Sequence, residues 1–274
     1  MTKYSFFGFP RVSYRHVTRD TIAIIGSLCV SKSIHPCYDQ IAAARVLRKL
    51  SREYDTHNLH IRYELENYDI VDLGDYPPDK LSSIVSSVLR QNARVIVVGG
   101  DHTTTYYGIR DTELTSIAIF DAHLDSEVLD NNTFHHGCVI RRIISELPKI
   151  SVRIIGFRGY STLKRELEFV QKKNIKVYDW PVSHEVILEE LSMNDAVSID
   201  LDFFNPNSFW AVRVPEVLGV DFSEFVQLVN MLESTKSRYI DIVEYIPKID
   251  LGFICGKCLI QLILEILALL VRST

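Results

Sequence analysis

Histidine and carboxylate side chains gather at four places in the sequence, each at or directly after a short apolar run. The four segments are Gly99-Gly100-Asp101-His102, Asp121-Ala122-His123-Leu124-Asp125, Asp200-Leu201-Asp202 and Glu244. Side chains two residues apart in an extended segment share a face, so Asp121, His123 and Asp125 should point the same way, as should Asp200 and Asp202. Carboxylates crowded together repel one another and are costly to bury unless cations neutralise them. The pattern therefore predicts a metal site.

The number of donors predicts two metal ions rather than one. Four aspartates and two histidines exceed the needs of one tetrahedral zinc ion but suit two ions that share bridging carboxylates. Mostly oxygen donors with one imidazole for each ion favour Mn(II), with Fe, Co, Ni or Zn as other occupants. Two metal ions ~3.5–4 Å apart can hold a shared water and lower its pKa toward ~7. The candidate ligands are His102, Asp121, His123, Asp125, Asp200 and Asp202.

The apolar runs predict the elements that position these residues. Eight runs read as strands: Ile22–Ile25, Ile70–Leu73, Arg94–Val98, Ile117–Phe120, Val152–Gly156, Ile175–Tyr178, Val197–Leu201 and Tyr239–Glu244. Several are apolar at successive residues, as is typical of parallel strands covered on both faces. Helical spacing predicts helices at Ile41–Leu50, Leu81–Leu89, Leu163–Val170 and Phe222–Leu232, the last with a cap at Asp221. The alternation predicts a three-layer α/β/α fold with an eight-stranded, mostly parallel sheet, whose carboxyl edge would carry the site.

Composition excludes several other classes of protein. The 30 Lys and Arg against 35 Asp and Glu give a net charge of −5, which argues against a basic nucleic-acid-binding surface. No linker or repeat divides the chain, so we read residues 1–274 as one domain. Five scattered cysteines do not form a secreted disulfide framework, and we expect Cys255 and Cys258 to be structural or incidental. The 14 residues Cys258–Val271 are too few to span a bilayer and predict a core helix. The first residues lack a signal-peptide pattern, so we expect a cytoplasmic protein.

The segments around His102, His123 and Asp200 resemble the three signature motifs of the ureohydrolases, the family of arginase, agmatinase and formiminoglutamase. The resemblance implies an arginase-like fold and two manganese ions per subunit. One ion would be held by His102 and Asp125 and the other by His123 and Asp202, with Asp121 and Asp200 bridging both. It also implies a small guanidino substrate, no nucleic-acid or membrane partner, and a homo-oligomer, either a trimer or a hexamer.

The same resemblance implies roles in catalysis for three residues. His136, which precedes Gly137, would shuttle protons near the leaving amine, and its neighbour His135 is the alternative. Glu244 would bind the guanidinium, because a carboxylate can pair with that planar cation through two hydrogen bonds. Asp125 would accept a hydrogen bond from the attacking hydroxide. The products would be an amine and urea, or formamide from a formimino substrate.

The sequence departs from the family pattern at two places near the expected site. Asn205 stands where the family has Asp, and Val214–Gly219 replaces a Pro-Glu-x-Gly-Gly pattern, with only Pro215-Glu216 and one glycine kept. These departures keep open a metal-binding regulatory protein without enzymatic activity. A related deacetylase would need a single zinc ion and a catalytic His-His pair, and the tandem motifs argue against it.

The loop after Asp125 indicates which kind of substrate tail the site would accept. Glu127 and Asp130 lie in that loop and would tolerate a cationic tail, which favours agmatine, cleaved to putrescine and urea. Arg141 and Arg142 would reverse this preference if they pointed inward, although we expect them to face solvent or a subunit contact. Arginine and formiminoglutamate are the alternative substrates.

Overall fold

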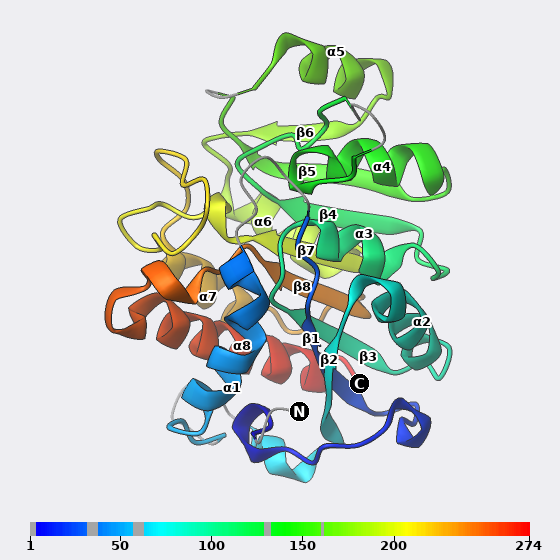
Figure 1. Ribbon diagram of the computed structural model, residues 1–274, viewed down its shortest axis with the longest axis vertical. Coiled ribbons are helices and arrows are strands. Elements are labelled where there is room, and N and C mark those ends of the chain that lie inside the picture. Colours follow the sequence, from blue (N-terminus) through cyan, green and yellow to red (C-terminus); the bar gives the residue numbers. More distant parts are fainter. Residues whose placement is uncertain (1–3, 32–37, 57–62, 129–132, 160–161) are drawn as a thin grey trace.

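An eight-stranded sheet forms the centre of the protein (Figure 1). The computed structural model describes residues 4–31, 38–56, 63–128, 133–159 and 162–274. The strand order is β2-β1-β3-β8-β7-β4-β5-β6, and every pairing is parallel. The strands are β1 (Ile22–Ser27), β2 (Ile70–Tyr76), β3 (Arg94–Val98), β4 (Ser116–Phe120), β5 (Ser151–Phe157), β6 (Lys176–Asp179), β7 (Ala196–Asp200) and β8 (Tyr239–Val243). Each predicted run falls on one of these strands, and the parallel sheet is confirmed.

Eight α-helices connect and cover the strands in the part of the chain that the structure describes. They are α1 (Ala43–Ser51), α2 (Pro78–Leu89), α3 (Thr103–Ile109), α4 (Val139–Glu146), α5 (Lys164–Lys172), α6 (His184–Met193), α7 (Phe222–Met231) and α8 (Ile254–Arg272). The four predicted helices correspond to α1, α2, α5 and α7. Asp221 caps α7 as expected, because its Oδ1 accepts the backbone N–H of Ser223 at 2.9 Å.

Alternating side chains of the strands build two apolar cores, one on each face of the sheet. In β3, Val95 and Val97 pack in the core that α2, α3 and α4 cover. Ile96 and Val98 pack in the opposite core, with α1, α6, α7 and α8. Figure 1 shows the two helical layers on either side of the strands. This arrangement confirms the three-layer α/β/α fold.

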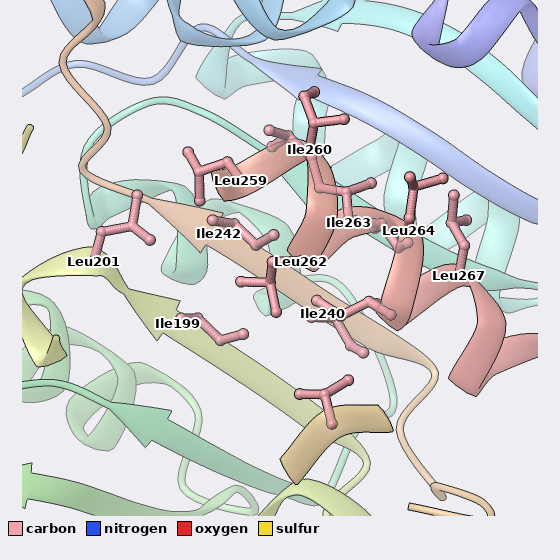
Figure 2. Close-up of a cluster of buried hydrophobic side chains, with 14 of the residues drawn as sticks. Ile199, Leu201, Ile240, Ile242, Leu259, Ile260, Leu262, Ile263, Leu264 and Leu267 are labelled. Carbon is pink, nitrogen blue, oxygen red and sulfur yellow. The ribbon is translucent and has the colours of Figure 1, made fainter. Parts of the chain in front are cut away.

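Helix α8 is the largest apolar element of the second core. Leu259, Leu262 and their neighbours pack against Ile240 and Ile242 of β8 and Ile199 of β7 (Figure 2). The helix has 19 residues, so the 14-residue prediction was too short. Residues Leu251–Arg272 are long and apolar enough to cross a membrane by length and composition. However, 78% of an 18-residue apolar stretch within them is buried inside the protein. The packing explains the apolar sequence and confirms a core helix, which contains the free, buried Cys255.

Candidate metal centre

The candidate ligands lie at the ends of four strands that are neighbours in the middle of the sheet. In the order β3-β8-β7-β4, the strand ends are followed by His102, Glu244, Asp202 and Asp121, and Asp200 is the last residue of β7. Parallel strands place all their carboxyl ends at one edge, and ligands bind at such edges. The predicted convergence of these residues is therefore what the topology produces.

A glycine turn after β3 brings His102 to this edge. Gly99 and Gly100 have φ of +93° and +79°, a region that side chains with a Cβ rarely adopt. A Cβ at Gly100 would lie 2.8 Å from the carbonyl oxygen of Cys29. The two glycines therefore let the chain reverse tightly between β3 and α3.

Three carboxylates surround one ring nitrogen of His102. Its Nδ1 lies 2.8 Å from Oδ2 of Asp125, 3.2 Å from Oδ2 of Asp200 and 3.3 Å from Oδ2 of Asp121. One ring nitrogen carries at most one proton and cannot donate to three oxygens. These four residues form the first group of potential metal ligands, which we call cluster 1.

A second group, cluster 2, consists of Asp121, His123 and Asp202. Nδ1 of His123 lies 2.9 Å from Oδ2 of Asp202 and 3.6 Å from Oδ1 of Asp121. Asp121 thus offers one oxygen to each cluster, as a bridging ligand would. Its Oδ2 is buried and has no hydrogen-bond partner among the described residues.

Asp200 and Asp202 converge for a different reason from the one the sequence suggested. The prediction placed both on one face of an extended segment, but β7 ends at Asp200, and Asp202 lies in a 3-10 turn, Leu201–Phe203. Oδ1 of Asp200 accepts the backbone N–H of Asp202 at 3.1 Å and stabilises this turn. Oδ2 of Asp200 therefore belongs to cluster 1, and the implied bridging of both ions by Asp200 stays a prediction.

The charges of the two clusters are unbalanced without a cation. Burial, reinforced by the neighbouring Asp202 and Asp125 carboxylates, raises the pKa of Asp121 to about 7, and burial with similar neighbours raises the pKa of Asp200. Burial opposes the charged form of His102, but its hydrogen bond to Asp125 and the charges of the surrounding carboxylates together outweigh this and raise its pKa to about 10. In the metal-free protein, protons bound to His102, Asp121 and Asp200 therefore offset part of the negative charge of the clusters. Oxygen-rich clusters with one imidazole each fit a pair of divalent metal ions in the same place.

Two residues of the sheet hold the far side of the His102 ring. Nε2 of His102 lies 3.4 Å from Oγ of Ser198, and Ser198 donates to Oδ1 of Asp241 at 2.6 Å. Ser198 and Asp241 are paired in register between β7 and β8. Such partners fix the orientation of metal-binding histidines. Sequence reasoning assigned no role to either residue, although polar side chains inside two apolar strands were the available signal.

Arg158, after β5, holds the turn that carries Asp202. Its guanidinium donates to the carbonyl oxygen of Phe203 at 2.9 Å and also to that of Asp202. Burial lowers the pKa of Arg158, and the nearby Asp202 and Asp121 carboxylates oppose that shift. The sequence analysis missed this residue, whose signal was an arginine directly after an apolar strand.

A cavity of about 190 Å³ opens beside the two clusters. A water molecule occupies about 30 Å³ of liquid, so the cavity has room for a small ligand. Its lining combines residues of both clusters with three further loops. These residues are His123, Leu124, Asp125, Glu127, His136, Gly137, Thr162, Glu166, Asp200, Asp202, Val212, Arg213, Val214 and Glu244.

His136 lines this cavity and His135 does not. Nδ1 of His136 lies 3.4 Å from Oγ of Ser31 and 3.3 Å from Nη1 of Arg213. Burial lowers the pKa of His136, and the Arg213 charge adds to this against the Asp125 carboxylate. Nε2 of His135 instead lies 3.9 Å from Oε2 of Glu127. The geometry favours His136 as the proton carrier.

Glu244 forms part of the cavity wall directly after β8. Its backbone φ of +73° is unusual for a residue with a side chain, and such strain is concentrated at functional sites. Oε1 accepts the backbone N–H of His102 at 2.8 Å, and Oε2 accepts from the side-chain amide of Gln40. Burial, with the charge of Asp101, raises the pKa of Glu244 to about 8. Glu244 therefore both holds His102 in place and faces the cavity.

The residues expected near the substrate tail are only partly in place. Glu127 lines the cavity with its side chain 42% exposed, and Asp130 lies outside the described residues. Neither Arg141 nor Arg142 lines the cavity. Nε of Arg141 donates to the carbonyl oxygens of Ser126 and Glu127, both at 2.8 Å. Arg141 therefore supports this loop and does not line the cavity, while remaining partly exposed.

The two departures from the family pattern lie in different surroundings. Oδ1 of Asn205 accepts the backbone N–H of Asn207 at 2.9 Å, so Asn205 stabilises a local turn. Oε2 of Glu216 lies 3.6 Å from Nε2 of His123, a ring nitrogen of cluster 2. That distance is too long for a hydrogen bond, and Nε2 of His123 has no hydrogen-bond partner among the described residues, so the role of Glu216 stays undecided.

Fold and site together define a three-layer α/β protein with two groups of potential metal ligands at the carboxyl edge of its sheet. The sequence model of the Arginase family matches residues 21–268. The chain is 31% identical over 217 residues to an uncharacterized 32.2 kDa protein of Methanothermus fervidus, covering 73% of this chain and 75% of that protein. It is 28% identical over 207 residues to N(1)-aminopropylagmatine ureohydrolase of Thermococcus kodakarensis, covering 70% of each chain. Formimidoylglutamase of Bacillus subtilis has the same fold, with a TM-score of 0.84, 17% identity and coverage of 100% of this chain and 94% of that one.

The chain belongs to the arginase family. It is a ureohydrolase, an enzyme class that hydrolyses C–N bonds in linear amidines. The resemblance found in its motifs is confirmed.

Proposed function

We propose that this protein is a binuclear manganese hydrolase that cleaves a C–N bond of a linear guanidino or formimino compound. One observation supports two ions above all: the Asp121 carboxylate has one oxygen in each of two separate ligand clusters. His102 and Asp125 would hold one ion, and His123 and Asp202 the other. Two divalent ions, when bound, would supply an activated water and positive charge for the tetrahedral transition state.

The residues around the cavity would bind and orient the substrate. Glu244, which lines the cavity outside the two clusters, can accept hydrogen bonds from a guanidinium cation. The lowered pKa of His136 leaves its ring neutral near pH 7. His136 must therefore first accept a proton from the site before it can donate one to the departing nitrogen.

The tail of the substrate has two candidates, each favoured by a different residue. Glu127 in the cavity lining favours the amine tail of agmatine, and one of the relatives is named for aminopropylagmatine. Arg213 in the same lining favours a carboxylate tail. We further expect a cytoplasmic enzyme that assembles as a trimer or hexamer, which light scattering of the purified protein would measure.

Urea release by the purified, manganese-loaded enzyme tests the proposed reaction. The panel contains agmatine, arginine, 4-guanidinobutanoate and formiminoglutamate, with formamide as the product measured for the last compound. We expect turnover of at least one compound, and loss of turnover in Asp125→Asn and Asp202→Asn, which remove one carboxylate from cluster 1 and cluster 2 respectively. If two ions are bound but no compound is turned over, a metal-binding regulatory role replaces the enzymatic one.

A further inference from the structure

We infer that Arg213 binds a carboxylate at the far end of the substrate, so that the preferred substrates are linear amidines with an anionic tail. The inference rests on the proposed function and adds the class of substrate. It differs from the agmatine preference read from the sequence, which depended on Glu127 and Asp130.

Arg213 lies close to the expected position of the reaction. It lines the cavity together with Val212 and Val214 and is half-buried. Its Nη1 is 3.3 Å from Nδ1 of His136. A guanidinium only donates hydrogen bonds, so this contact leaves Nδ1 of His136 as the acceptor. Arg213 therefore lies at the wall where the leaving part of the substrate must pass.

The backbone beside Arg213 is fixed by the sheet. Ile246, just after β8, donates its N–H to the carbonyl oxygen of Ala211 at 2.8 Å. Val212 donates to the carbonyl oxygen of Trp210 at 2.9 Å, and its side chain is buried. These hydrogen bonds fix the backbone from which the Arg213 side chain extends at the cavity wall.

The cavity lining carries six carboxylates and one guanidinium. Among the lining residues, all in the described part of the chain, Arg213 is the one lysine or arginine. Asp125, Asp200 and Asp202 belong to the two clusters. The cavity therefore offers the Glu244 carboxylate to the amidine end of a ligand and the Arg213 guanidinium to another part of it. A zwitterion with an amidinium and a carboxylate matches this distribution.

Glu127 and Glu166, the two lining acids besides Glu244 that lie outside the clusters, are engaged elsewhere. Glu166 of α5 accepts the backbone N–H groups of Ser126 at 3.2 Å and Leu163 at 2.9 Å. Glu127 is 42% exposed to solvent and lies 3.9 Å from His135. Water screens an exposed carboxylate, so Glu127 should attract a cationic tail only weakly. Arg213 would repel the same tail, whereas its planar fork can bind a carboxylate through two hydrogen bonds.

Three guanidines of similar length separate the effect of the tail from that of the head. These are 4-guanidinobutanoate with a carboxylate, butylguanidine with a methyl group and agmatine with an amine. Calorimetric titration of the manganese-loaded protein measures their affinities, and urea release measures KM and kcat. We expect 4-guanidinobutanoate to bind most tightly. One charge-assisted hydrogen-bond contact corresponds to a factor of about 10 to 100 in affinity.

Variants of Arg213 test whether this residue causes the preference. Arg213→Met should weaken binding of 4-guanidinobutanoate by about 10- to 100-fold and leave butylguanidine within about 3-fold, and Arg213→Lys should recover part of the loss. Lys164→Met is the matched control, because Lys164 on α5 is 91% exposed. The ratios of its affinities for the three guanidines should equal those of the wild type. Glu127→Gln should leave the ratios unchanged as well. Thermal unfolding of each variant verifies that it is folded.

Several outcomes would overturn the inference. The first is that the wild type binds agmatine more tightly than 4-guanidinobutanoate. The second is that Arg213→Met and the wild type have the same ratios of affinities for the three guanidines. The third is that none of the three compounds binds. A carboxylate preference that is lost in Arg213→Met, without urea release from any compound, would support the binding role of Arg213 and contradict the proposed reaction. Urea release with a preference that does not depend on Arg213 would support the reaction and contradict the inference.

Discussion

Replacing Asp121 by asparagine should stabilise the metal-free protein and remove its response to metal. Burial and neighbouring carboxylates raise the pKa of Asp121 from 3.8 to about 7, a shift of about three units. Each unit corresponds to about 1.4 kcal/mol, so ionised Asp121 costs the folded metal-free protein up to about 4 kcal/mol. Because the folded-state pKa is the higher one, this cost is absent below about pH 4 and complete above about pH 7. Asparagine carries no charge and avoids the cost.

Thermal unfolding of EDTA-treated protein measures this effect. Near pH 8, Asp121→Asn should raise the Tm by up to about 10 °C, since 1 kcal/mol shifts the Tm of a protein of this size by about 2–4 °C. At about pH 5 the difference should be smaller, because Asp121 is then protonated in the folded state. Manganese at 100 times its Kd should stabilise the folded wild type by about 2.7 kcal/mol and so raise its Tm. It should not raise the Tm of the variant.

A buried carboxylate outside the site serves as the control. Asp72 is fully buried, and its Oδ2 lies 2.7 Å from Nε of Arg48. Asp72→Asn should destabilise the protein by up to about 3–5 kcal/mol, because it removes one of the two carboxylates, Asp72 and Asp75, that pair with the buried Arg48. It should preserve the response to manganese. A lower metal-free Tm for Asp121→Asn near pH 8, or a wild-type response of that variant to manganese, would refute this reasoning.

Three further predictions concern the surroundings of the ligands. Ser198→Ala removes the hydroxyl between His102 and Asp241, so manganese affinity should fall by about 10- to 100-fold in a calorimetric titration; unchanged affinity would contradict the orienting role of Ser198. Gly100→Ala should lower the metal content of the purified protein, since a Cβ there meets the Cys29 carbonyl oxygen at 2.8 Å, and full metal content in elemental analysis would show that the turn tolerates a side chain. Manganese binding should release protons and strengthen as pH rises, because His102 and Asp121 bind protons with pKa values of about 10 and about 7 in the metal-free protein. Titrations in buffers of different ionisation enthalpy count these protons, and a count of zero would contradict the charge balance described for the clusters.

The ligand clusters could be predicted from the sequence because they depend on a regular feature of the fold. Apolar runs mark parallel strands, and parallel strands end at one edge, so polar residues directly after the runs must meet there. The structure brings His102, Asp121 and Asp200 together in this way. That rule does not predict the local backbone geometry after a strand ends. Asp202 reaches cluster 2 through a 3-10 turn, and its position depends on hydrogen bonds from Arg158, a residue distant in sequence.

The residues that sequence analysis missed act through contacts between elements far apart in the chain. Ser198 and Asp241 are 43 residues apart and meet only because β7 and β8 are neighbours in the sheet. Arg213 and His136 are 77 residues apart and meet across the cavity wall. Helix α3, Thr103–Ile109, begins with three threonines, which are poor helix formers, and its position after the glycine turn depends on tertiary packing. Neither spacing nor composition reports such contacts.

Anomalous diffraction from crystals grown with manganese tests the central claim most directly. The account predicts two peaks per chain, one among His102, Asp121, Asp125 and Asp200 and the other among Asp121, His123 and Asp202, with the Asp121 carboxylate between them. A single peak, or two peaks that do not share Asp121, would contradict it.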